Sequence, residues 1–192
     1  MNTWFTADHH FGHANIITYC NRPFYSAGEM DEAMVARWNE VVRPDDVVYH
    51  LGDLTLSKDI RYVAGILERL NGVVRLVPGG HDKWVNRITS RWEGDVFSRK
   101  LQVLPPLVIL PLPGQLKKVV VSLCHYPMLS WERSHHGMPH FHGHSHGGYG
   151  ITGGSGDGET GGRKRGVRID VGVDCWDFYP VHLNTLSEVI HA

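Results

Sequence analysis

The sequence VRLVPGGHDKWV, residues 74–85, begins as an apolar run and ends in a turn that carries two ionisable side chains. Pro78 and Gly79 interrupt the run, which predicts a strand that breaks sharply into a loop. His81 and Asp82 follow directly on that loop. An imidazole and a carboxylate placed directly after a strand suggest a functional position at one end of a sheet.

Other apolar runs of the chain end in the same way. They finish in ADHHFGH at 7–13, LGD at 51–53, SLCHYP at 122–127 and GHSH at 143–146. In α/β sheets, ligands gather beyond the carboxyl ends of the strands, where successive loops converge. We therefore expect a cage of carboxylates and imidazoles there, made of Asp8, His10, Asp53, His81, His125, His144 and His146.

The patterns between these runs predict the fold class. Ser26 and Glu29 form an S-x-x-E capping box before a helical pattern, and residues 59–70 give a second amphipathic helix. A short helix is expected at 83–92 and a closing one at 183–192. Strands and helices alternate in the first half, whereas the second half reads as consecutive, antiparallel strands. We expect an α/β fold, a two-sheet βαβαβ sandwich of mixed sheets flanked by helices.

Length and composition are those of an ordinary globular domain. The 192 residues, 42% hydrophobic and 20% charged, suit a single domain over 1–192. The Gly-rich stretch 147–163 is interpreted as a mobile loop. A formal net charge of -1 gives no overall field for nucleic acid or an anionic membrane, so only GGRKRGVR at 161–168 offers a basic patch.

The chain carries no signal for export or membrane insertion. Its start, MNTWFTADHH, lacks the basic and apolar regions of a signal peptide, and no apolar run approaches the ~20 residues that span a bilayer. Three scattered cysteines make neither a disulfide framework nor a CxxC zinc site. We expect a cytoplasmic protein with no membrane partner. The sequence does not indicate an oligomeric state.

The residue types of the predicted cage indicate metal chemistry. Oxygen and nitrogen ligands without thiolate suit manganese, iron, zinc, cobalt or nickel. Six strong ligands exceed the four of a structural zinc site. The surplus predicts two ions about 3.5–4 Å apart, bridged by a carboxylate, which would activate a shared water and neutralise the charge of a phosphoryl group.

The sequence resembles the calcineurin-like metallophosphoesterases, in particular the small prokaryotic and phage members. Their ordered blocks are D-x-H, G-D, G-N-H-[DE], a lone His and G-H-x-H. This chain has DHH at 8–10, GD at 52–53, GGHD at 79–82, CHYP at 124–127 and GHSH at 143–146. The stretches CNRPF, VVYHLGD and VGVD also look like those members.

The resemblance implies a role for each matching residue. Asp8, His10 and His146 would hold the first ion, His125 and His144 the second, and Asp53 would bridge both. His81 would be no ligand but would lie beside the scissile bond, where it would protonate the leaving oxygen or stabilise the transition state. Manganese is the ion we expect, with iron, zinc, cobalt and nickel as alternatives.

Gly80 departs from the family pattern. The family has Asn there, and its side-chain oxygen binds the second ion. Glycine offers no such oxygen, so water would fill the gap and the second site would be weaker. A tolerated natural change, a specialised site and an engineered substitution are all open explanations.

Other candidates each have a structural alternative. His13 is a candidate to reach the substrate phosphate, or else a surface histidine. Arg22 in NRPF is a candidate to clamp phosphate through its planar fork, or else part of a structural ion pair. Asp82 would orient His81 or cap the following helix. His9 is interpreted as structural.

The function we expect is hydrolysis of a phosphoester, preferably a phosphodiester, by a bridging hydroxide at a dinuclear metal centre. A compact chain without a cap domain would leave the site open to diesters. One alternative is a nuclease acting on DNA or RNA, with a nucleotide or nucleic acid as partner. Others are a non-catalytic protein-binding scaffold with a weakened metal site, and a His-rich tract, SHHGMPHFHGHSH at 134–146, that buffers metal.

Overall fold

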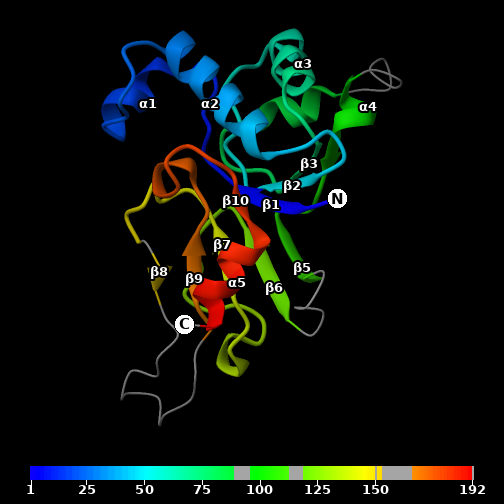
Figure 1. Cartoon of the computed structure of the whole chain (residues 1–192), viewed down its shortest axis with the longest axis vertical. Helices are drawn as coiled ribbons and strands as arrows, with labels where there is room; N and C mark the ends of the chain where they lie inside the picture. The colour runs from blue at the N-terminus through cyan, green and yellow to red at the C-terminus, as the bar shows by residue number, and fades with distance from the viewer. Residues whose placement is uncertain (89–95, 113–118, 150, 153–165, 192) are drawn as a thin grey trace.

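The computed structural model describes residues 1–88, 96–112, 119–149, 151–152 and 166–191. Two five-stranded sheets form the body of the molecule (Figure 1). The first has the order β10-β1-β2-β3-β4, with β1 (Thr3–Thr6), β2 (Val47–His50), β3 (Val73–Leu76), β4 (Leu101–Val103) and β10 (Val181–His182). The second has the order β5-β6-β7-β9-β8, with β5 (Leu107–Pro111), β6 (Val120–Cys124), β7 (His140–His142), β8 (Ile151–Thr152) and β9 (Arg168–Asp170).

Helices connect and flank these strands. They are α1 (Ala14–Tyr19), α2 (Ala27–Val41), α3 (Ile60–Arg69), α4 (Val96–Lys100) and α5 (Leu183–His191), with 3-10 helices η1 (Lys83–Arg87), η4 (Ser134–His136) and η6 (Val173–Cys175). The α/β class with two mixed sheets is therefore as expected. Within the described residues, no helix is long and apolar enough to cross a membrane.

The predicted start of α2 is confirmed. The hydroxyl of Ser26 accepts a hydrogen bond from the Glu29 amide at 3.1 Å, which satisfies one free N–H of the first turn. The Glu29 carboxylate reaches back to the amide of Tyr25 instead of that of Ser26, at 2.8 Å. The capping box thus closes one residue earlier than its usual form. Asp59 caps α3 in a similar way through the Arg61 amide.

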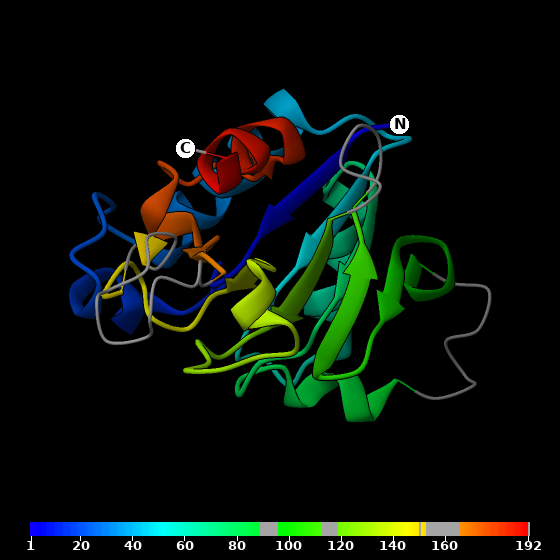
Figure 2. The ribbon, with the colours of Figure 1, turned by 90° about the horizontal axis from the view of Figure 1, so that it is seen from below.

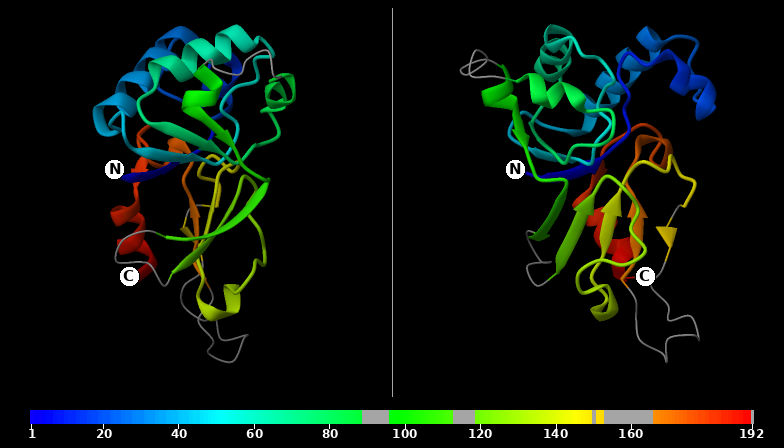
Figure 3. Two further views of the ribbon diagram at one scale, coloured as in Figure 1. Left: turned by 90° about the vertical axis from the view of Figure 1, so that its right-hand side faces the viewer. Right: turned by 180° about the vertical axis from the view of Figure 1, so that it is seen from behind.

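Two apolar cores lie on opposite faces of the first sheet. One packs β2 and β3 against α2 and α3, around the fully buried Trp38. The other lies between the two sheets and includes Phe5, Tyr49 and Phe141. Figure 3 shows α2 and α3 on one side of the first sheet and the second sheet on the other. Burying each such side chain contributes about 1.5–3 kcal/mol, so the first sheet is fixed from both faces.

The helix α5 closes the core between the sheets. Its apolar side chains Leu183 and Leu186 are buried with Phe5 of β1. Figure 2 shows α5 (red) along the side of β1 (dark blue). The expectation of a closing helix over these residues is confirmed.

The expectation of antiparallel strands in the second half is wrong in part. β4 pairs parallel with β3 and belongs to the first sheet, and β6, β7 and β9 pair parallel with one another. Only β5 with β6 and β8 with β9 are antiparallel in the second sheet. Parallel neighbours need connections of about a dozen residues or more. The connection between β6 and β7, residues 125–139, contains the short 3-10 helix η4 and no long helix, so the sequence pattern there gave no sign of direction.

Some local expectations also differ from the structure. The stretch after Phe11 contains α1 (Ala14–Tyr19) where a loop was expected. The helix expected at 83–92 is the 3-10 helix η1 over Lys83–Arg87, and α4 was not anticipated. Of the Gly-rich stretch 147–163, residues 150 and 153–163 lie outside the described residues, as do 161–165 of the basic stretch.

The parallel strands place the candidate residues at one edge. Thr6, His50 and Leu76 are neighbours across β1, β2 and β3, so the three strands end at the same level. The segments after them carry Asp8, Asp53 and His81. The strands β6 and β7 end in the segments that carry the other candidates. The common edge follows from parallel pairing.

Asp46 connects the beginnings of β1 and β2. It is fully buried and accepts hydrogen bonds from the Asn2 amide at 2.5 Å, the Trp4 indole at 3.0 Å and the Arg43 amide at 3.1 Å. Burial opposes ionisation, but these donors outweigh it and lower the pKa of Asp46 to about 2. A lowered pKa in the folded state adds stability above the ordinary pKa, and that stability is lost as the pH falls through the lowered one.

We therefore expect Asp46→Asn to destabilise the protein at neutral pH and to flatten the acid dependence of its melting temperature between pH about 4 and about 2. Thermal melts over this range would measure the effect. Asp45→Asn is the matched control, because Asp45 is exposed beside the amino terminus. An Asp46→Asn variant whose melting temperature falls with pH as steeply as that of the unchanged protein would contradict the assignment.

Candidate metal centre

The candidate ligands lie on loops with unusual backbone conformations. Asp8, His10, Asp53, His144 and His146 have φ angles of 61°, 54°, 57°, 68° and 46°. Left-handed conformations are uncommon for residues other than glycine and cost about 1–3 kcal/mol each when the surroundings impose them. Five such residues at one edge of the molecule, all from the predicted set, indicate a site whose geometry is imposed by the fold.

The first three predicted ligands come together. Asp8, His10 and His146 each offer a ligand atom, and these atoms lie within 4.8 Å of one another. The rings of His10 and His146 stack with their centroids 5.2 Å apart. Asp8 is fully buried, and its Oδ2 accepts a hydrogen bond from the His144 amide at 2.8 Å. We call Asp8, His10 and His146 the first group.

The other three predicted ligands form a second group. The ligand atoms of Asp53, His125 and His144 also lie within 4.8 Å of one another. His125 is buried, and its Nδ1 donates to the carbonyl oxygen of Leu51 at 2.8 Å. A carbonyl only accepts hydrogen bonds, so this contact fixes the tautomer and leaves Nε2 free to face Asp53. His144 is exposed, which places one side of the second group near solvent.

Asp53 faces both groups. Its Oδ2 lies 3.7 Å from Nε2 of His10 and 3.4 Å from Nε2 of His125. Its Oδ1 accepts a hydrogen bond from the His81 amide at 2.9 Å. Burial alone would raise the pKa of Asp53, but the charge of nearby His125 and the hydrogen bond from the His81 amide hold it below its usual range. The carboxylate therefore stays ionised in the position that a bridging ligand needs.

Several polar atoms of the two groups lack hydrogen-bond partners within the part of the chain that the structure describes and are suited to bind a cation. Among the described residues, Asp8 Oδ1, both ring nitrogens of His10 and Nε2 of His125 are buried without a hydrogen-bond partner. An unpartnered buried polar atom costs about 1–3 kcal/mol. Burial raises the pKa of Asp8 to about 7 and lowers that of His10 to about 3. Metal ions bind neutral imidazoles and ionised carboxylates. His10 is already in the neutral form that binds a cation, whereas Asp8 would lose a proton when a cation binds.

Glycines allow the loops to approach so closely. A Cβ on Gly79 would overlap Asp53 Oδ1 and lie 2.9 Å from the His125 ring. A Cβ on Gly143 would lie 2.6 Å from Asp8 Oδ2. The φ of Gly79 is not positive, so what requires glycine at this turn is the lack of space for a Cβ.

Asp82 has a different role from either expected one. Its Oδ2 accepts from the amides of Asp53 and Gly79 at 2.7 and 2.8 Å, and its Oδ1 from the Leu54 amide and the Trp84 indole at 2.9 and 3.2 Å. Among the described residues it has no hydrogen bond with the preceding imidazole, and it caps no amide of η1. The buried carboxylate instead joins the loops after β2 and β3, which fixes the position of Asp53.

The expectation that Arg22 clamps phosphate is wrong. Arg22 is only 5% exposed, and its Nε and Nη2 donate to the two carboxylate oxygens of Asp174, both at 2.8 Å. Its remaining hydrogen bonds include the carbonyl oxygens of Asp8 and His9, at 2.7 and 3.0 Å. The alternative, a structural ion pair, is correct. Arg22 thus holds the loop after β1 in place through the carbonyl oxygens of Asp8 and His9.

Asp174 is a site residue that the sequence reasoning did not single out. Besides the Arg22 pair, its Oδ2 accepts a hydrogen bond from Nδ1 of His146 at 2.7 Å. This carboxylate fixes the orientation of His146 so that Nε2 faces the first group. The only signal in the sequence was the VGVD stretch, which carried part of the resemblance.

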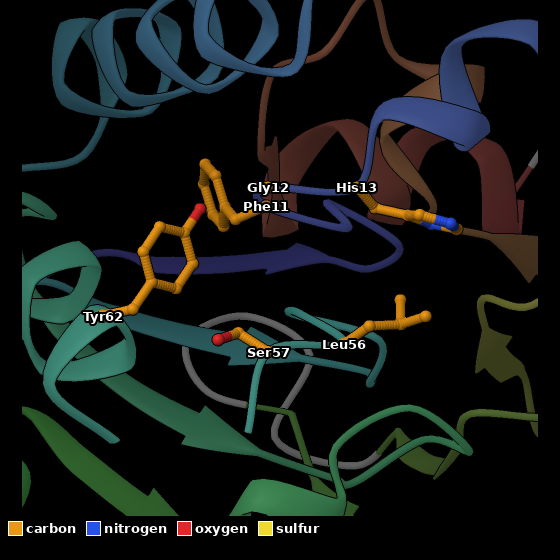
Figure 4. Close-up of a pocket in the computed structure, with 6 residues that line it drawn as sticks. All are labelled: Phe11, Gly12, His13, Leu56, Ser57 and Tyr62. Atoms are coloured by element: carbon orange, nitrogen blue, oxygen red, sulfur yellow. The ribbon is translucent and has the colours of Figure 1, made fainter. Parts of the chain in front are cut away.

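His81 and His13 lie at the border of the two groups. The side chain of His81 is 46% exposed, and its Nε2 lies 3.8 Å from Asp53 Oδ2. The ring of His13 lies 5.6 Å from that of His10. His13 also lines a pocket of about 360 Å³ with Phe11, Gly12, Leu56, Ser57 and Tyr62. Figure 4 shows Phe11 and Tyr62 on one side of this pocket and His13 and Leu56 on the other.

The remaining histidines are not part of the two groups. His9 is buried and lies 2.9 Å from His50 between ring nitrogens, which confirms its structural interpretation. His140 and His142 are buried in β7, and His135 and His136 are exposed on η4. The His-rich tract is thus divided between several environments.

Comparisons with known proteins support the fold and leave the activity open. No family model matches the chain. It is 51% identical over 79 residues to the uncharacterized protein MJ1445 of Methanocaldococcus jannaschii, which covers 41% of this chain and 45% of that protein. It is 35% identical over 83 residues to the Gene 66 protein of Mycobacterium phage L5, covering 42% and 40%. The matched segment thus spans less than half of each of these relatives.

A solved structure resembles the whole chain. The protein of unknown function AQ665 from Aquifex aeolicus superposes with a TM-score of 0.68 and 20% sequence identity, over 98% of both chains. At this identity the likeness shows a shared fold. The two-sheet α/β arrangement is therefore one that another protein adopts over its whole length.

The contacts of Asp174 predict a measurable effect on metal binding. Asp174→Asn removes the acceptor that orients His146 and leaves the buried Arg22 without its charge partner. Loss of such a partner weakens metal binding by about 10–100-fold. We expect this weakening for one of two Mn²⁺ ions in isothermal titration calorimetry.

Asp177→Asn serves as the control, because Asp177 is exposed in the same loop and asparagine tolerates its positive φ. The assignment of Asp174 would fail if both variants bound Mn²⁺ alike. Circular dichroism of the metal-free variants would establish that each is folded.

Proposed function

We propose that this protein is a metal-dependent phosphoesterase of the calcineurin-like type. The observation that carries the proposal is that the six candidate ligands converge in two groups, and that the carboxylate of Asp53 faces both. The groups are Asp8, His10 and His146, and Asp53, His125 and His144. The ordered sequence blocks from residue 8 to residue 146 supply the same six residues. The residues that the ordered blocks supply are also those that converge in space, and this agreement supports the proposal.

The donor set fits two divalent ions, with manganese as the expected metal. When bound, such a pair activates a water molecule and neutralises charge on a phosphoryl group. The protein's own part is to hold Asp53 ionised between the groups and to present His10 as a neutral imidazole. Asp82 and Asp174 hold these ligands in place through the hydrogen bonds described above. Buried carboxylates thus hold the centre in place on one side, and the exposed His81 and His144 lie on the side that is open to solvent.

His81 is the proposed proton donor to the leaving oxygen. Its amide is tied to Asp53 Oδ1, whereas its side chain is half-exposed and lies at the border of the centre. An imidazole that is not needed as a ligand is free to move a proton at its Nε2 or to stabilise charge in the transition state. His13, at the rim of the pocket beside His10, is the proposed contact to the substrate phosphate.

A phosphodiester is the substrate class that we favour. His81 and His144 are both exposed, so the second group is accessible from solvent among the described residues. An open centre accommodates a substituent on each side of the phosphate. The nuclease alternative depends on a basic patch, but the structure describes only residues 166–168 of the stretch 161–168. The scaffold alternative requires that the protein bind without turnover.

We expect Mn²⁺-dependent hydrolysis of a generic aryl phosphodiester, with a lower kcat/KM for the aryl monoester. His81→Ala should reduce kcat by about 10²–10⁴-fold, the usual contribution of a positioned acid or base, while two Mn²⁺ ions still bind. Absorbance of the released phenol measures turnover, and calorimetry measures the bound ions.

Two further variants complete the experiment. His136→Ala is the control, since His136 is an exposed histidine on η4 outside the centre. Asp53→Asn should abolish both turnover and paired ion binding, because an amide does not bridge two cations. Absence of turnover in the unchanged protein, despite two bound ions, would favour the scaffold alternative and overturn the proposed function.

A further inference from the structure

Position 80 is the place where this chain departs from the pattern that it otherwise follows. Gly80 has no side chain to offer the second group, although its neighbours Gly79 and His81 both approach Asp53. A Cβ placed on Gly80 would lie 3.1 Å from the hydroxyl oxygen of Tyr126 and within 4 Å of no other described atom outside its chain neighbours. The space beside position 80 is therefore held by a phenol from another loop.

The ring of Tyr126 contacts the rings of two members of the second group, His125 and His144. It meets the His125 ring edge-on, with centroids 4.7 Å apart at 76°, and the His144 ring at 4.8 Å and 69°. The carbonyl of Tyr126 lies 3.2 Å from Nε2 of the buried His140. The residue is nevertheless 47% exposed, so packing alone does not account for its position. Its hydroxyl oxygen lies beside position 80, where the family pattern has an asparagine.

We propose that Tyr126 replaces the missing side chain at position 80 and supplies the additional oxygen donor of the second group. This inference rests on the proposed metal centre and adds a residue to it. A phenolic oxygen is a hard donor that suits the same cations as carboxylate oxygens. Gly80 then has a physical explanation, because any larger side chain there competes with the phenol for the same space.

The test uses Tyr126→Phe, which keeps the ring on His125 and His144 and removes only the oxygen. In calorimetric titrations with Mn²⁺ we expect the unchanged protein to bind two ions and the variant to bind the second at least about tenfold more weakly, with the first unaffected. Tyr149→Phe is the control, because Tyr149 is also exposed and lies outside both groups. A near-ultraviolet tyrosine difference spectrum on filling the second site should be lost in Tyr126→Phe alone.

A double-mutant cycle identifies the shared space. Gly80→Asn alone should gain little affinity for the second ion, because the phenol occupies the position of its side chain. Combined with Tyr126→Phe, the same asparagine should restore most of the affinity that Tyr126→Phe loses. The two changes are then strongly non-additive, as expected for groups in contact.

The outcomes separate the inference from the proposed function. If the unchanged protein binds two ions and Tyr126→Phe binds them with equal affinity and an unchanged difference spectrum, Tyr126 is not a donor and the inference is overturned. If Gly80→Asn raises the affinity for the second ion equally in the presence and absence of the Tyr126 hydroxyl, the two side chains do not compete for the same space and that part of the inference is overturned. If the unchanged protein does not bind two ions, the proposed centre itself fails, and the inference with it.

Discussion

The carboxylate of Asp53 is the point on which the arrangement depends. One oxygen holds the His81 amide and the other faces His10 on one side and His125 on the other. Its own amide is held by Asp82, which belongs to the loop after the next strand. A single side chain thus connects the loops that follow β1, β2, β3 and β6. Removing its charge would leave several imidazoles facing one another without a shared partner.

The fold accepts strain to make this possible. The ligand loops contain residues at positive φ, and buried ring nitrogens are left unpartnered among the described residues. The loops approach until no Cβ fits at Gly79 or Gly143. Both apolar cores lie against the first sheet and stabilise it independently of the site. Strain at the strand ends is therefore offset by packing elsewhere, which is the usual relation between a rigid scaffold and a functional edge.

The sequence predicted the ligand groups because their signals are local. An Asp or His directly after an apolar run marks a strand end, and parallel strands bring such ends to one edge. Strand direction in the second sheet was not local, so β6, β7 and β9 were wrongly expected to be antiparallel. Arg22 was misassigned because its partner Asp174 lies 152 residues away in the sequence. Asp82 contacts the loop after β2, and Tyr126 contacts His144 from another loop, and neither gave a sequence pattern of its own.

The most direct test of the central claim is anomalous diffraction from crystals soaked in Mn²⁺. We expect two peaks about 3.5–4 Å apart, one on Asp8, His10 and His146 and one on Asp53, His125 and His144, with Asp53 between them. A single peak, or peaks on the exposed histidines of η4 in place of these groups, would show that the two groups do not form a dinuclear metal centre.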